Sequence, residues 1–175
     1  MQPLHFLLRY SDKISRVDTI AEHKSVLETQ GSVWMGKFGI GMGKKFADIA
    51  KEQISKNLNS YLYLMNGSVY THKALLSDVR IGYSSKTGVL TSDNKLTPKY
   101  YQKTPCTVWF KLKSIEEITK NDIENLWLYN CPGSQPSKAG MRGLIYITER
   151  CEENMPITKN KPKNQSSLYT GGLFD

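Results

Sequence analysis

Short apolar runs alternate along the chain with segments whose apolar residues recur at helical spacing, a combination typical of a mixed α/β domain. Residues 4–10 form an apolar run that ends where polar residues resume, which predicts a buried strand. Residues 61–65 repeat this pattern, and the Asn66-Gly67 pair after them predicts a hairpin with a return strand over residues 69–81. Further strands are expected over residues 32–35, 106–113 and 143–148.

Two longer helices are expected. From Lys44 to Leu58 the apolar residues recur at helical spacing with lysines and acids between them, which predicts an amphipathic helix. A second helix begins after Asp18, a favourable N-cap residue, and ends at Gly31. A short helix is expected after Asn121. Residues 82–105 lack either period and are expected to form a long loop that can carry function.

The chain has 175 residues, 39% of them hydrophobic, which is enough for one sizeable core. We expect one domain over residues 1–150. Residues 151–175 are rich in Asn, Lys, Pro, Ser and Gly, and we expect them to form a flexible tail or linker, which suggests that the module is tethered to another domain.

Cysteine spacing and hydropathy indicate a cytoplasmic protein. Cys106, Cys131 and Cys151 lie too far apart for a zinc or redox pair, so free thiols in a reducing compartment are expected. No stretch approaches the roughly 18 apolar residues of a membrane span, and no membrane association is expected.

Basic residues exceed acidic ones by 24 to 16, which gives a net charge of +8. Three lysines balance three acids within residues 151–175, so the whole excess lies in residues 1–150. A basic excess can serve solubility alone, but it is also typical of proteins that bind nucleic acid.

No enzyme signature is found, and no cofactor or metal is expected. The glycine-rich segment 36–43 has Phe38 where a phosphate-binding P-loop needs glycine, and Lys45 where it needs Ser or Thr. The three histidines lack metal-binding spacing, and the acidic residues do not cluster as in a two-metal nuclease. We instead expect this loop to touch a phosphate backbone through Lys37, Lys44 and Lys45.

Several aromatic residues stand beside basic ones. Examples are Arg9-Tyr10, Trp34 ahead of Lys37, and Lys99-Tyr100-Tyr101. A stacking ring next to a phosphate-neutralising charge is what recognition of a single base requires. The alternative for each ring is simply to fill the core.

Short motifs also follow one another in a characteristic order. They are residues 5–11 (HFLLRYS), Gly31-Ser32-Val33-Trp34, Val108-Trp109-Phe110, and a run from Asn130 through Lys138 and Arg142 to Gly143. This order resembles that of the YTH and EVE domains of the PUA-like superfamily, and related modules precede the motor domains of McrBC-type restriction systems. The resemblance implies a small twisted β-barrel with flanking helices. It also implies recognition of a methylated base, most often N6-methyladenine, held in an aromatic cage.

The resemblance further implies roles for individual residues. Trp34 takes the position of the first cage wall and Tyr100 that of the second, with Tyr101 or Tyr83 as alternatives, while Asp18 and Ser11 contact the base. Six basic residues are expected to bind phosphate: Arg9, Lys37, Lys44, Lys45, Lys138 and Arg142.

The sequence departs from the family pattern in three places: Met35 replaces the usual Ser or Cys after Trp34, an insertion separates Ser11 from the first helix, and the second wall is a tyrosine. The function expected is the targeting module of a modification-dependent restriction system, which flips a modified base out of duplex DNA and is tethered to a motor or nuclease domain. Two alternatives remain: a PUA-like module that binds RNA, and a nuclease or nucleotide-modifying domain.

Overall fold

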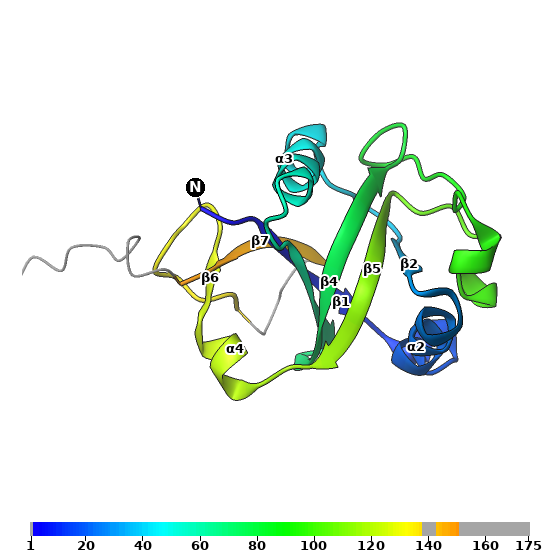
Figure 1. The fold of residues 1–175 in the computed structure, drawn as a ribbon, viewed down its shortest axis with the longest axis horizontal. Helices are drawn as coiled ribbons and strands as arrows, with labels where there is room; N and C mark the ends of the chain where they lie inside the picture. Colours follow the sequence, from blue (N-terminus) through cyan, green and yellow to red (C-terminus); the bar gives the residue numbers. More distant parts are fainter. Residues whose placement is uncertain (1, 138–142, 151–175) are drawn as a thin grey trace, which may run out of the picture.

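One strongly twisted seven-stranded sheet organises the chain (Figure 1). The computed structural model describes residues 2–137 and 143–150. The strands are β1 (His5–Tyr10), β2 (Val33–Lys37), β3 (Tyr61–Asn66), β4 (Val69–Ile81), β5 (Val108–Glu117), β6 (Leu126–Leu128) and β7 (Leu144–Glu149). Their order is β2-β5-β4-β3-β1-β7-β6. All neighbouring pairs are antiparallel except β1 and β3, which are parallel. The fold is thus mixed α/β, as the sequence predicts.

Local signals account for the long helices. Helix α2 (Thr19–Gln30) begins where the Asp18 carboxylate accepts a hydrogen bond from the backbone N–H of Ala21, and it ends at Gly31, whose φ of 80° suits glycine. Helix α3 (Lys44–Ser55) buries Ala47 and Ala50 and ends three residues before Leu58, which is partly exposed. Both predicted helices are confirmed, although α3 is shorter than expected.

The hairpin between β3 and β4 forms as predicted, but its turn lies one residue further along. Asn66 is the last residue of β3 and pairs with Val69, so the two loop residues are Gly67 and Ser68. Gly67 has a φ of 63°. A positive φ at the first loop residue alone is typical of a type II′ turn, in which glycine is favoured at this position.

Several short elements carry too few residues to show a period. They are helix α1 (Asp12–Ser15), the single turns η1 (Asn94–Leu96) and η2 (Lys99–Tyr101), and strand β6. The expected short helix after Asn121 is present as α4 (Lys120–Glu124), capped by Thr119 and Asp122. In the part of the chain that the structure describes, no helix is both long and apolar enough to cross a membrane.

Side-chain alternation on the strands divides the interior between two faces of the sheet. On β1, Phe6 and Leu8 join the main core beneath α3, whereas Leu7 joins a smaller cluster with Tyr63 and Ile147 on the other face. A third cluster covers the β2 edge and contains Trp34, Tyr101, Cys106 and Trp109. The third cluster, together with β1, positions the candidate site.

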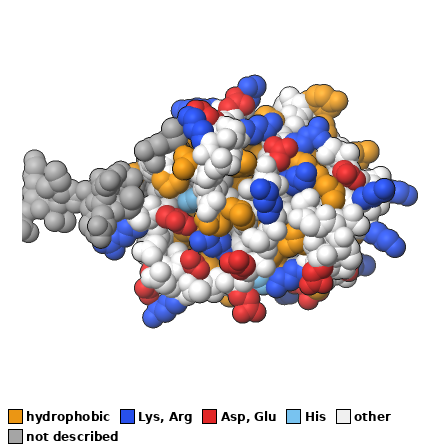
Figure 2. Space-filling view, viewed as in Figure 1, with side chains coloured by type: hydrophobic (Ala, Val, Ile, Leu, Met, Phe, Trp, Pro, Cys, Tyr) orange, Lys and Arg blue, Asp and Glu red, His pale blue; other side chains and the backbone are white. Residues whose placement is uncertain are grey.

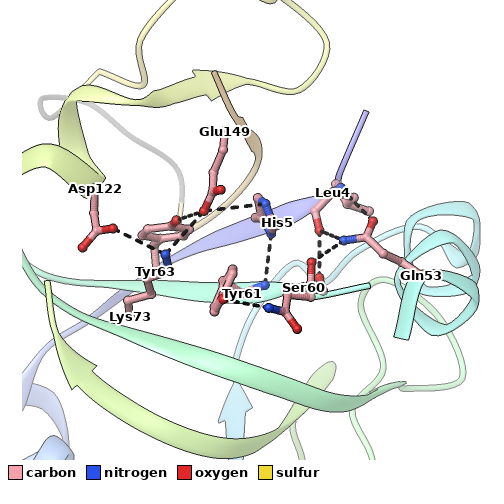
Figure 3. Close-up of polar contacts among 10 residues, drawn as sticks. Leu4, His5, Gln53, Ser60, Tyr61, Tyr63, Lys73, Asp122 and Glu149 are labelled. Atoms are coloured by element: carbon pink, nitrogen blue, oxygen red, sulfur yellow. Dashed lines mark hydrogen bonds and ion pairs between the residues drawn. The ribbon is translucent and has the colours of Figure 1, made fainter. Parts of the chain in front are cut away.

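A polar network closes the smaller cluster and ties β7 to the middle of the sheet (Figure 3). The Tyr63 hydroxyl donates to Glu149 at 2.6 Å, and the Lys73 ammonium lies 3.4 Å from the carboxylates of both Glu149 and Asp122. The His5 Nε2 atom lies 3.9 Å from Glu149. These contacts lower the pKa of Glu149 against the opposing effect of burial.

Candidate nucleic-acid interface

A cavity of about 160 Å3 opens between the end of β1 and the edge strand β2. In the sheet these strands are separated by β3, β4 and β5, so both can line one cavity only because the sheet curls back on itself. This volume is well below the roughly 300–1,000 Å3 of sites that bury a drug-sized ligand, and it suits a single planar group. The lining residues are Leu8, Arg9, Tyr10, Ser11, Ile14, Ser15, Thr19, Met35, Gly36, Lys37, Phe38, Tyr101 and Gly143.

Helix α1 and the start of α2 close one side of the cavity. The Asp12 carboxylate accepts a hydrogen bond from the backbone N–H of Thr19 at 3.0 Å, which fixes α1 against α2. Tyr10, at the end of β1, is held by a 3.0 Å hydrogen bond between its hydroxyl and that of Thr71. This wall therefore has a defined position although α1 is only four residues long.

Two aromatic rings form a further part of the wall, and one of them, Tyr101, packs against His23 of α2 with ring centroids 5.7 Å apart. Tyr101 is buried, and its ring centroid lies 5.4 Å from that of Phe38, which is 45% exposed. Trp109 and Tyr100 support Tyr101 from behind at centroid distances of 5.9 and 4.4 Å. An accessible ring backed by a fixed one is suited to stacking on a flat ligand.

The polar lining is cationic and rich in hydroxyl groups. The Lys37 ammonium donates to the carbonyl oxygens of Phe38 at 2.7 Å and Ile40 at 2.6 Å, and burial lowers the pKa of Lys37. Arg9 provides a second cation, and Ser11, Ser15 and Thr19 provide hydroxyls. No Asp or Glu lies among the described lining residues. The cavity therefore offers donors from the cations and acceptors from the hydroxyls.

Gly36 allows β2 to pass between the cavity and the third cluster. A Cβ atom at this position would lie 2.5 Å from the Cys106 sulfur and 2.9 Å from the Trp109 ring. A larger residue would therefore displace the groups that support Tyr101. Burial raises the pKa of the Cys106 thiol to about 12, so this thiol stays protonated and is a packing group.

Trp34 does not line this cavity, contrary to the expected cage. Its indole is only 4% exposed and packs in the third cluster with Cys106 and Trp109. Alternation along β2 turns Trp34 away from the Met35 side of the strand, which contributes to both the cavity and the main core. The three residues that follow Trp34 on β2, Met35 to Lys37, do line the cavity.

The other base-contact predictions divide into two groups. Ser11 and the alternative wall Tyr101 line the cavity. Tyr100 lies behind Tyr101, Tyr83 is 89% exposed and outside the lining, and the Asp18 carboxylate caps α2. Phe38 was not among the predicted wall residues. Its position in a glycine-rich loop beside Lys37 is the signal that could have marked it as an exposed ring.

The predicted phosphate contacts are also dispersed. Arg9 and Lys37 line the cavity, while Lys44 and Lys45 are exposed on α3, where Lys44 pairs with Asp48 at 2.6 Å. Lys138 and Arg142 lie outside the described residues, as does the predicted tail over residues 151–175. Figure 2 shows basic and acidic side chains interspersed over the face in view, which therefore carries no broad area of one sign.

Comparison with known proteins identifies the family. A family model described as Pua-like matches residues 6–140. The chain belongs to the Pua-like family. No curated protein and no solved structure matches it. Pua-like domains are generally binding modules rather than enzymes, and membership of the family supports nucleic acid as the ligand class. Among the described residues of this Pua-like chain, no three His, Cys, Asp or Glu side chains are grouped as metal ligands would be.

Proposed function

We propose that this Pua-like domain reads a modified base that has been flipped out of duplex DNA into the cavity between β1 and β2. One observation carries the proposal: a cavity the size of a single planar group combines the Phe38 and Tyr101 rings with two cations and the hydroxyls of Ser11, Ser15 and Thr19. The resemblance to YTH and EVE domains supports the same function.

N6-methyladenine is the first candidate base. The Watson–Crick edge of this base presents one N–H donor and one ring-nitrogen acceptor. Hydroxyls of Ser11, Ser15 or Thr19 can accept from the former, and Arg9 can donate to the latter. Apolar side chains such as Leu8 and Met35 in the lining provide a place for the methyl group.

The free energies of flipping, stacking and methyl burial show how the cavity could select a modified base. Flipping costs a few kcal/mol, while stacking on an aromatic ring contributes about 1–3 kcal/mol per base. Burial of one methyl group adds about 0.8 kcal/mol, which gives only several-fold discrimination. Stronger selectivity requires that an unmodified base leave the cavity poorly filled or a polar group unpaired.

Phe38→Ala tests the proposal because this ring is exposed enough to be removed without opening the core. We expect the variant to bind a duplex that carries N6-methyladenine at least about ten-fold more weakly, as the loss of one stacking partner implies. The matched control is Tyr83→Ala, which removes an exposed ring outside the lining and should bind as the intact protein does.

The binding panel should contain duplexes with adenine and cytosine modifications, the same duplexes unmodified, and a structured RNA. A cytosine modification bound best would revise the identity of the base. If the intact protein bound modified and unmodified duplexes equally, or preferred the RNA, the base-reader proposal would be wrong.

In the cell, we propose that the domain is the targeting module of a modification-dependent restriction system and acts with a motor or nuclease domain. The resemblance to modules of McrBC-type systems supports this role. Cells carrying the complete locus should exclude a methylated plasmid, and Phe38→Ala should abolish that exclusion. Equal transformation by methylated and unmethylated plasmid would contradict it.

A further inference from the structure

Two bulky apolar side chains at or near the cavity are largely exposed to solvent. Ile14 on α1 is 79% exposed and lines the cavity, and Ile40 in the loop after β2 is 72% exposed. Ile40 follows two residues after Phe38, which forms part of the aromatic wall. Two different segments, one in the cavity lining and one next to it, therefore each carry an exposed apolar tip.

The backbone beneath each tip is fixed by hydrogen bonds. Ile14 lies in a helical turn closed by the bond from the Arg16 N–H to the Asp12 carbonyl at 2.8 Å. The Ile40 carbonyl accepts from the Lys37 ammonium at 2.6 Å, and the next residue, Gly41, donates its N–H to Ser85 at 2.8 Å. The two isoleucines therefore stand on a fixed backbone. Because the adjacent cavity contains two cations, we expect the partner that meets these side chains to be anionic.

Base flipping supplies a reason for such tips. A base that leaves the helix opens a gap between its neighbours, and proteins that unstack DNA commonly insert Ile, Leu, Phe or Met side chains between base steps. Such a wedge buries its own apolar surface and reduces the cost of the gap. Single-stranded DNA has no such gap to fill.

We propose that Ile14 and Ile40 are positioning residues that enter the base stack beside the flipped nucleotide and keep the duplex open there. The inference rests on the proposed function and adds to it the residues that fill the gap left in the duplex. The exposed basic residues beside Ile14, Lys13 and Arg16, are suitably placed for the phosphates of the same duplex.

Serine substitutions at Ile14 and Ile40 test the wedge, each assayed with the same modified strand in duplex and single-stranded form. We expect Ile14→Ser and Ile40→Ser to weaken duplex binding about ten-fold each and to leave single-strand binding unchanged. A 2-aminopurine placed beside the modified base should become brighter on binding the intact protein and less bright with either variant, because unstacking dequenches it.

Leu58→Ser is the matched control. Leu58 is 49% exposed and lies at the opposite end of β1, where nearby Ser60 bonds to the Leu4 carbonyl. Leu58→Ser should change neither the affinity for the modified duplex nor the affinity for the modified single strand. Equal losses on duplex and single strand, or no loss on either, would overturn the wedge. Because discrimination by the intact protein between modified and unmodified single strands reports on the cavity alone, the wedge and the base reader can fail separately.

Discussion

At the scale of single residues, the ammonium of Lys37 contacts the protein itself. Its hydrogen bonds to the carbonyls of Phe38 and Ile40 hold one wall of the cavity and one apolar tip. The sequence predicted a phosphate contact here, because a lysine in a glycine-rich loop has that role in many proteins. The intervening Gly39, with a φ of 71°, lets the loop turn back so that both carbonyls reach the same ammonium.

Lys37→Met should therefore act through the loop. The methionine keeps an apolar stem but cannot donate, so we expect an affinity for modified duplex about ten-fold lower, with a salt dependence close to that of the intact protein. A direct phosphate contact would instead reduce the slope of log K against log salt by about 1. Binding measured across a salt series distinguishes the two roles.

Lys44→Met serves as the comparison for that series. Lys44 is exposed, pairs with Asp48 on the surface of α3 and is absent from the cavity lining. Its substitution should leave the preference for modified over unmodified duplex unchanged. A Lys37→Met variant that matched Lys44→Met in both affinity and preference would show that the loop does not depend on this ammonium.

Among the helices and strands, local sequence signals predicted the features that depend on neighbouring residues, namely helix caps, apolar strands and a turn. The caps of α2 at Asp18 and Gly31, the apolar runs of β1 and β3, and the glycine turn after β3 each depend on residues adjacent in the chain. Elements such as α1 and η2 were missed because three or four residues cannot display a period, and their positions depend on tertiary contacts such as that of Asp12 with Thr19.

The capping role of Asp18 yields a prediction that separates it from base reading. Asp18→Ala should lower the free energy of unfolding by about 1 kcal/mol, because α2 loses its N-cap. Asp18→Asn should leave both stability and discrimination close to those of the intact protein, since asparagine caps equally well. Denaturant unfolding and duplex binding measure the two effects. Lost discrimination in a stable Asp18→Asn variant would restore the base-reading role.

At the scale of the whole molecule, the site depends on how distant segments meet. Ser11, Tyr101, Arg9 and Lys37, which the sequence predicted as base or phosphate contacts, line one cavity, but the sequence could not show that β1 and β2 both border it. The resemblance to YTH and EVE domains assigned the first cage wall to Trp34, and neither that motif nor the nearby lysines indicate whether the ring is open or buried. Cover from the third cluster is a long-range property that no local pattern reveals.

Two histidines buried at separate places make the stability of the whole domain sensitive to mild acid. His23 lies behind Tyr101 with its Nδ1 atom 2.6 Å from the Thr19 carbonyl, and the His5 Nδ1 accepts from the backbone N–H of Tyr61. Burial lowers the pKa of each from 6.5 to about 4. Glu149 opposes this effect at His5, and Lys73 adds to it.

The unfolded chain binds these protons at higher pH than the folded chain does, so stability should be complete above pH 6.5 and fall as the pH drops towards 4. Each histidine contributes up to about 3 kcal/mol to this loss. The pKa of Glu149 is lowered from 4.5, so its contribution to stability is lost in a separate pH range, below 4.5. Urea unfolding at pH 7 and pH 4.5 should show the difference, and His23→Phe should reduce it by removing one of the buried imidazoles. A wild-type stability that stayed constant between these pH values would contradict the assignment of both imidazoles as neutral groups in the folded protein.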